Sequence, residues 1–200
     1  MQTVTLGISG ASGMPIAFAL LEQLLEHNCK VRLVVTTAGM VTIKQETEIA
    51  LSANPEHARE ILHDKLKLKN GYLNNLEVYT NLDWYAPMAS GSSVSDAMVV
   101  CPCSMATLGK IAHGIGDDLL TRAADVTLKE RKNLILVVRE SPLSAIHLLN
   151  MHKLACLGVA IIPPVLQFYT HPNTIEDMIN FTVARILDQI GIETNLVTRW

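Results

Sequence analysis

The sequence predicts an α/β fold in which helices cover both faces of a parallel sheet. Short apolar runs rich in β-branched residues alternate with helical patterns along the chain, which is typical of βαβ units. Of the 200 residues, 49% are hydrophobic and 18% are charged. This composition provides a sizeable buried core and excludes a largely disordered chain.

The first half of the chain alternates as follows. Residues 4–8 form an apolar strand, and residues 15–26 form a helix because their apolar residues recur at helical spacing. A second strand is expected at 31–35, followed by helices at about 38–51 and 56–68.

The second half repeats the pattern. We expect a central strand at 97–100, a strong helix at 118–131, a buried strand at 134–138, a further strand at 159–162 and a last helix at 174–190.

Local signals mark one loop and one helix start. Residues 86–95 are rich in Ser and Gly and are expected to be a loop. Ser141 and Pro142 predict the start of a helix, with Ser141 as its N-cap and Pro142 in the first helical position.

Composition also limits the partners. A net charge of −3 and 4% aromatic residues argue against nucleic acid as a ligand. No apolar run approaches the about 20 residues of a spanning helix, and the N-terminus does not resemble a signal peptide, so we expect a cytoplasmic protein without membrane contact. Its apolar content indicates that some surface is buried between subunits.

The cysteines are interpreted as reduced packing residues. Cys101 and Cys103 are separated by one residue only, which is neither a redox spacing nor a zinc-binding one, and no second ligand pair follows. The seven His residues show no metal spacing either. No metal is expected.

Ligands of open parallel sheets bind at the carboxyl ends of the strands. After the first strand, the run Gly7-Ile8-Ser9-Gly10-Ala11-Ser12-Gly13 is suited to an anion at a helix start, although its glycine spacing is not the dinucleotide fingerprint. The second strand ends in Thr36, where a dinucleotide site would need an acidic residue. A mononucleotide phosphate fits better, with a plain turn as the alternative.

Ser104 begins a second helix start of this kind. The run Ser104-Met105-Ala106-Thr107 follows a central strand, and Ser104 can cap the helix. Its first N–H groups can bind another part of the ligand.

Charged residues follow the later strands. Arg122 and Lys129 share one helical face, with Asp125 between them, which is either a surface ion-pair ladder or part of a site. Arg139 and Glu140 follow a buried strand, so a charged pair emerges at the ligand edge of the sheet.

Taken together, these segments resemble the UbiX-type flavin prenyltransferases. The matching motifs run in family order along essentially the whole chain: Gly7-Ile-Ser-Gly-Ala-Ser-Gly13, Glu46-Thr47, Asp83-Trp84, Ser90-Gly91-Ser92, Cys101-Pro-Cys-Ser104, Arg122-Ala-Ala-Asp125, Leu128-Lys-Glu-Arg131, Arg139-Glu140-Ser-Pro142, Pro163-Pro164, Phe168-Tyr169, Ala184-Arg185-Ile-Leu187 and Arg199-Trp200. The combination is highly specific, although each piece alone is not. Many relatives have Ser-Lys where this chain has Thr36-Thr37.

The resemblance implies one FMN-binding domain over residues 1–200, with a flavodoxin-like Rossmann three-layer sandwich around a parallel sheet. It implies transfer of a dimethylallyl group from dimethylallyl phosphate to N5 and C6 of reduced FMN. The product, prenylated FMN, would serve a UbiD-type decarboxylase in ubiquinone biosynthesis or aromatic acid decarboxylation. The expected assembly is a homododecamer, without a metal.

The resemblance also assigns residues. Those expected to hold FMN are Gly10, Ala11, Ser12, Thr36, Ser104, Met105, Ala106, Thr107, Arg122 and Arg139. Those expected at the donor are Trp84, Ser90, Gly91, Lys129, Tyr169, Arg185 and Trp200, with Arg139 also close to its phosphate. The catalytic set is Glu46 and Glu140 as acid/base candidates, with Lys129 and Arg139.

Two alternatives use the same fold. An FMN-dependent cysteine decarboxylase would need a His in the first helix and an Asn-x-x-Met-Trp string, and the sequence has neither. A flavin carrier without enzymatic activity would need one phosphate site only, which leaves Lys129, Arg139 and Arg185 unexplained.

Overall fold

A six-stranded parallel sheet forms the centre of the protein. The structure, a computed structural model, describes residues 1–197. The strand order is β3-β2-β1-β4-β5-β6, and every neighbouring pair is parallel, which confirms the predicted fold class. The strands are β1 (Thr3–Ile8), β2 (Lys30–Val35), β3 (Leu76–Thr80), β4 (Ala97–Cys103), β5 (Asn133–Val138) and β6 (Ala160–Ile161).

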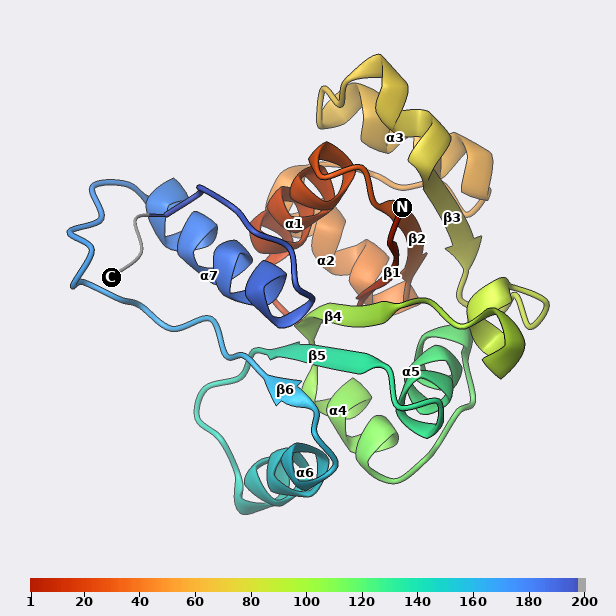
Figure 1. Cartoon of the computed structure of the whole chain (residues 1–200), viewed down its shortest axis with the longest axis vertical. Helices are drawn as coiled ribbons and strands as arrows, with labels where there is room; N and C mark the ends of the chain where they lie inside the picture. Colours follow the sequence, from red (N-terminus) through yellow and green to blue (C-terminus); the bar gives the residue numbers. More distant parts are fainter. Residues whose placement is uncertain (198–200) are drawn as a thin grey trace.

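Helices cover both faces of the sheet (Figure 1). One layer contains α1 and α7, with α2 and α3 beside them, and the other contains α4, α5 and α6. Their bounds are α1 (Met14–Glu26), α2 (Thr37–Thr47), α3 (Pro55–Lys65), α4 (Met105–Ala112), α5 (Leu119–Lys129), α6 (Ala145–Cys156) and α7 (Ile175–Gln189). Within residues 1–197, no helix is long and apolar enough to cross a bilayer.

Strand β4 shows why the central strands read as continuous apolar runs. Ala97 and Val99 face the core that contains α1 and α7, whereas Met98 and Val100 face the core that contains α4 and α5. Successive side chains of a strand point to opposite faces, so a strand buried on both faces needs apolar residues at every position.

The helix start predicted at Ser141 and Pro142 is wrong. These residues form a turn in which the peptide bond before Pro142 is cis, and α6 begins three residues later, after Ser144. The Ser144 hydroxyl accepts the N–H of His147 at 3.3 Å, and the His147 ring lies 3.2 Å from the Ser144 nitrogen. This reciprocal cap fixes the helix start at Ser144.

Other differences concern lengths. The helices expected at 38–51 and 56–68 end earlier, at Thr47 and Lys65, where Glu48 and Lys67 adopt the left-handed conformation (φ 60° and 52°). The last strand is reduced to β6. Strand β3 was not predicted at all, while the 86–95 loop contains only two short 3₁₀ turns, η2 (Pro87–Ala89) and η3 (Gly91–Ser93).

Candidate active site

The strand order reverses between β1 and β4, which is where open α/β sheets bind ligands. Ser9, just after β1, ties the two strand ends together. Its hydroxyl donates to the carbonyl of Pro102 at 2.9 Å and accepts the N–H of Ser104 at 2.8 Å. The 10–13 loop and the start of α4 therefore lie side by side, as the sequence predicted.

Two capped helix starts open at this edge. The Thr36 hydroxyl accepts the N–H of Gly39 at 3.0 Å, and the Ser104 hydroxyl accepts the N–H of Thr107 at 3.3 Å. Further N–H groups in the first turn of α4, those of Met105 and Ala106, have no acceptor among the described residues. These groups, together with the helix dipole, favour an anionic ligand.

Gly10 allows α2 to approach the β1 turn. A Cβ atom at position 10 would lie 2.5 Å from the Cβ of Ala38, closer than real Cβ contacts come. Ala11 is buried, and Ser12 and Gly13 are half-buried. The small residues of this loop therefore bring the start of α2 against the turn after β1.

Glu46 occupies the start of α1, which sequence reasoning had left to the ligand. Its Oε2 accepts the N–H groups of Gly13 at 3.0 Å and Met14 at 2.9 Å. Burial works to raise the pKa of Glu46, but hydrogen bonds from the Ser12 hydroxyl and the two N–H groups, with the charge of Arg139, lower it overall. The remaining backbone N–H groups at the starts of α2 and α4 are therefore available to an anionic ligand, whereas those at the start of α1 are already bonded to Glu46.

Arg139 and Glu140 lie at the same edge, directly after β5. The N–H of Arg139 donates to the carbonyl of Cys103 at 3.2 Å, which places Arg139 beside the end of β4. Glu140 Oε1 accepts the N–H of Ser141 at 2.9 Å. Both side chains are exposed, so the pair emerges at the ligand edge as predicted.

Lys129 lies away from this edge, at the last residue of α5. Three residues separate it from Asn133, the first residue of β5, so it belongs to the amino end of the sheet. There it lies near the 90–91 turn: a Cβ on Gly91 would be 2.7 Å from Lys129 Nζ. Lys129, Ser90 and Gly91 therefore form one group.

Arg122 lies in the first half of α5 and contacts the same loop at Ala89. Its Nε donates to the carbonyl of Ala89 at 3.2 Å, and its Nη1 lies 3.4 Å from Asp125 Oδ2. Only half of the ion-pair ladder that the sequence left open is therefore present, because Lys129 pairs with Glu130 and not with Asp125. Arg122 also holds the loop.

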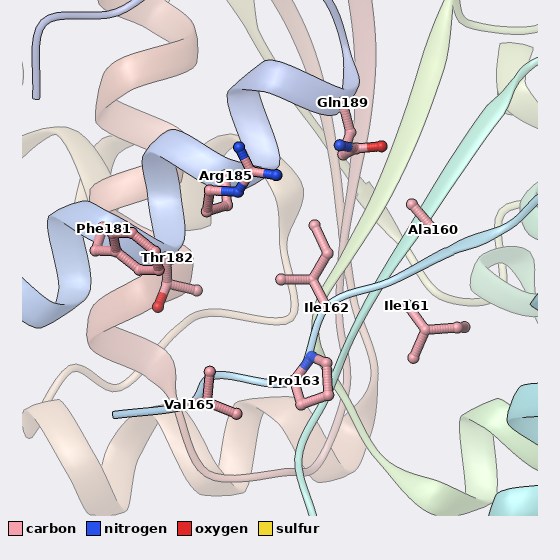
Figure 2. A pocket seen from close by; sticks show the side chains of 9 residues that line it. All are labelled: Ala160, Ile161, Ile162, Pro163, Val165, Phe181, Thr182, Arg185 and Gln189. Atoms are coloured by element: carbon pink, nitrogen blue, oxygen red, sulfur yellow. The ribbon is translucent and has the colours of Figure 1, made fainter. Parts of the chain in front are cut away.

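Arg185 and Tyr169 lie on the opposite face of the sheet. Arg185 is on α7 and borders a pocket of about 450 Å³ between α7 and the segment after β6, whose walls include Ile162, Val165 and Phe181 (Figure 2). Tyr169 packs edge-on against Phe181 at 5.9 Å. Since α7 and α5 cover different faces, one chain does not bring Arg185 and Lys129 together.

The two tryptophans are placed differently. Trp84 lies in the turn between β3 and η2 and is 48% exposed. Trp200 lies outside the described residues.

The cysteines of β4 are packing residues, as predicted. Cys101 and Cys103 are fully buried, and burial raises the pKa of both thiols, that of Cys103 to about 12. Over residues 1–197, no group of three or more His, Cys, Asp or Glu side chains is arranged to hold a metal ion.

Sequence reasoning missed two residues of this region. Arg32 Nη1 donates to the carbonyl of Ser93 at 2.8 Å, and Glu130 pairs with Lys129. A charged Arg within the apolar run of β2 was a usable signal, whereas Glu130 reads as an ordinary surface residue.

Comparisons with known proteins decide the family. The Flavoprotein family model matches residues 1–187. The flavin prenyltransferase UbiX of Pseudomonas aeruginosa is 42% identical over 199 residues, which cover all of this chain and 94% of the relative. The chain belongs to the flavin prenyltransferase family. Another member, LpdB of Lactiplantibacillus plantarum, is 40% identical over 201 residues. The alignment covers all of this chain and 98% of LpdB.

Solved structures of flavin prenyltransferase relatives have the same fold. The structure of AnUbiX (PadA1) in complex with FMN and dimethylallyl pyrophosphate has a TM-score of 0.86 and is 38% identical in sequence. The match covers 100% of this chain and 97% of the AnUbiX chain. A dodecameric FMN-dependent UbiX-like decarboxylase from Escherichia coli O157:H7 gives 0.85 at 39% identity, with 99% and 98% covered. The peptidyl-cysteine decarboxylase EpiD, at 17% identity and a TM-score of 0.58, shares the fold alone.

Proposed function

We propose that this chain is a flavin prenyltransferase that binds FMN and transfers a dimethylallyl group from dimethylallyl phosphate to N5 and C6 of reduced FMN. The observation that carries the proposal is the edge between β1 and β4, where the free N–H groups of Met105 and Ala106 lie beside the 10–13 loop. These small residues and N–H donors fit a phosphate-bearing flavin. The family and the AnUbiX complex support the same ligands.

Within this proposal, residues 1–200 form one FMN-binding domain, and the site residues divide into roles. The residues that hold the flavin are Gly10, Ala11, Ser12, Thr36, Ser104, Met105, Ala106, Thr107, Arg122 and Arg139. Reduced FMN is the acceptor substrate and supplies the nucleophilic N5 and C6 atoms. Loss of phosphate from the allylic carbon separates charge, so cations such as Arg139 stabilise the transition state. Closing the second bond adds a proton to the middle carbon of the prenyl chain and removes one from C6; the released phosphate supplies the first, and Glu140 takes the second.

Glu46 is less suited to proton transfer than Glu140. Its pKa lies below the ordinary value, and its oxygen Oε2 is already bonded to two backbone N–H groups. A carboxylate held in its charged form is a weak base. We therefore propose that Glu46 keeps the 10–13 loop in place and leave proton removal to Glu140.

The donor site is completed by neighbouring subunits. Lys129 and Arg185 lie on opposite faces of one chain, so both can reach one phosphate only if different subunits supply them. Helix α6 exposes Ile146, Leu148 and Leu149 at 68%, 53% and 67%, an apolar face that water disfavours. With the dodecameric relative from E. coli, this face supports a homo-oligomer, for which we propose twelve subunits.

We further propose that prenylated FMN passes to a UbiD-type decarboxylase, as the resemblance implies. The cytoplasmic location stays a prediction.

The direct test is product formation. The purified protein, incubated without oxygen with reduced FMN and dimethylallyl phosphate, should yield a flavin heavier by one five-carbon prenyl unit in mass spectrometry. Heat-denatured protein is the control. A flavin of unchanged mass with bound FMN would instead indicate a flavin carrier. In a parallel incubation with a peptide that ends in cysteine, decarboxylation of that peptide would indicate a cysteine decarboxylase.

A further inference from the structure

Glu130 is an exposed carboxylate that pairs with the proposed phosphate-binding Lys129. Its Oε1 accepts a hydrogen bond from Lys129 Nζ, directly after the last residue of α5. The two side chains are 48% and 37% exposed for Lys129 and Glu130. A pair this exposed is weak, and the ammonium has three N–H donors, so a phosphate dianion can share the ammonium with the carboxylate.

Gly91 forms the surface against which this pair rests. A Cβ atom at position 91 would lie 2.7 Å from Lys129 Nζ and 2.9 Å from Glu130 Cδ. No side chain fits there unless the pair moves. The missing Cβ therefore leaves room for the ammonium group and the carboxylate beside the backbone of this turn.

The loop that contains Gly91 is anchored on both sides. On one side the Nε of Arg122 donates to the carbonyl of Ala89 at 3.2 Å. On the other, Nη1 of Arg32 donates to the carbonyl of Ser93 at 2.8 Å, and the Ser93 hydroxyl donates to the carbonyl of Pro87 at 2.7 Å. Gly91 is thus part of a fixed wall.

We propose that Glu130 is a positioning residue that holds Lys129 Nζ against Gly91 before the phosphate of the donor binds. The inference rests on the proposed function of Lys129. A free lysine side chain samples many rotamers and loses this freedom when it binds a ligand. Ordering Lys129 in advance removes part of that loss, so the donor binds more tightly.

The first experiment separates binding from turnover. In FMN-loaded enzyme, Glu130→Gln should raise the KM for dimethylallyl phosphate about two- to fivefold, the range of an exposed ion pair, with kcat nearly unchanged. The Kd of the same phosphate, measured by calorimetry without turnover, should rise by the same factor. Glu60→Gln, an exposed carboxylate on α3, is the matched control and should change neither. Flavin content and the urea midpoint of each variant check folding.

The second experiment asks whether Glu130 acts through Lys129. Adding Glu130→Gln to Lys129→Ala should cause no further change in KM or Kd. Independent, additive effects of the two substitutions would overturn the inference. An unchanged KM in Glu130→Gln would overturn it too. So would a lower KM in that variant, which would show that Glu130 competes with the donor for Lys129. If Lys129→Ala itself leaves KM and turnover unchanged, the proposed role of Lys129 fails, and the positioning role with it. If Lys129→Ala loses turnover or donor binding while Glu130→Gln leaves KM and Kd unchanged, only the positioning role of Glu130 is overturned.

Discussion

Oε2 of Glu46 lies 2.9 Å from the backbone nitrogen of Met14, at the first residue of α1. The residue that would normally cap this helix is Gly13, which has no side chain to do so. A carboxylate from α2 therefore acts as the cap of α1, 32 residues away in the chain. This contact joins the 10–13 loop to α2 on the side where we place the flavin.

Glu46→Gln should lower the free energy of unfolding by about 0.5–1 kcal/mol near neutral pH, because the charge at the helix start is lost. The folded-state pKa of Glu46 is lowered, so its stabilising effect is present above the unfolded value near 4.5 and is lost as the pH falls through the folded value. Urea unfolding at several pH values checks this. The difference between the variant and the parent should shrink steadily below about pH 4.5, and a difference that stays constant there would contradict the assignment.

Gly10→Ala should destabilise the protein by about 1–3 kcal/mol and reduce bound FMN, because the new methyl group collides with Ala38. Gly71→Ala is the matched control, since a Cβ atom there has no neighbour within 4 Å. Thermal unfolding and the flavin-to-protein absorbance ratio measure both effects. Equal behaviour of the two variants would show that the close approach of α2 is unimportant.

Lys129→Ala and Arg185→Ala should each keep FMN and lose about one to two orders of magnitude in turnover, the usual effect of a lost charged hydrogen bond. If different subunits supply the two cations to one phosphate, mixed oligomers of the two variants contain some sites with both cations intact. Dissociating, mixing and reassembling the variants should then restore part of the activity. Lys65→Ala on α3 serves as the control for the loss of a surface cation, and mixtures that stay as inactive as their components would argue against a shared site.

Glu140→Gln should slow the second bond-forming step more than the first. The amide keeps the size of the side chain but cannot accept the proton from C6, whereas the departure of phosphate depends on cations that remain. Rapid mixing followed by absorbance should resolve two phases, the slower of which is delayed in the variant. If both phases slow together, Glu140 orients Arg139 and is not the base.

Ile146→Asp should break the oligomer into smaller species, because a charge would be buried in the exposed apolar face of α6 that we propose packs against other subunits. Light scattering at micromolar concentration measures the mass, and circular dichroism confirms that the subunits stay folded. An unchanged mass would place the subunit contacts on another surface.

The parts of the fold set by local pattern could be predicted from the sequence. The apolar run of β5 and the capped helix α7 lie close to the expected residues, because burial on both faces and a capping Thr174 leave clear signals. Strand β3 was missed because only Leu76 is buried, and its other residues are half-buried, so no apolar run marks it. The start of α6 was misplaced because Ser141 and Ser144 both precede apolar residues, and only the contact with His147 distinguishes them.

The flavin edge of the candidate site was predictable for a similar reason. Residues that follow adjacent parallel strands must meet, so Ser9 and Ser104 could be placed together from topology alone. The positions of Lys129 and Arg185 could not, because helix direction and face depend on how whole elements pack. The cap that Glu46 provides to α1 was equally invisible, since it joins two helices through one side chain.

The pairing of β1 bears on how this chain acquires its structure. Strand β1 has β2 on one side and β4 on the other, with Val4 opposite Ala97, and the turn after β1 is tied to Pro102, 93 residues away in the chain. Contacts between such distant residues form slowly, because a long loop must close first. During synthesis, one side of β1 lacks its neighbour until about half of the protein has been made. Until then the free edge of β1 presents unpaired backbone N–H and C=O groups next to apolar side chains, so aggregation of nascent chains would begin there.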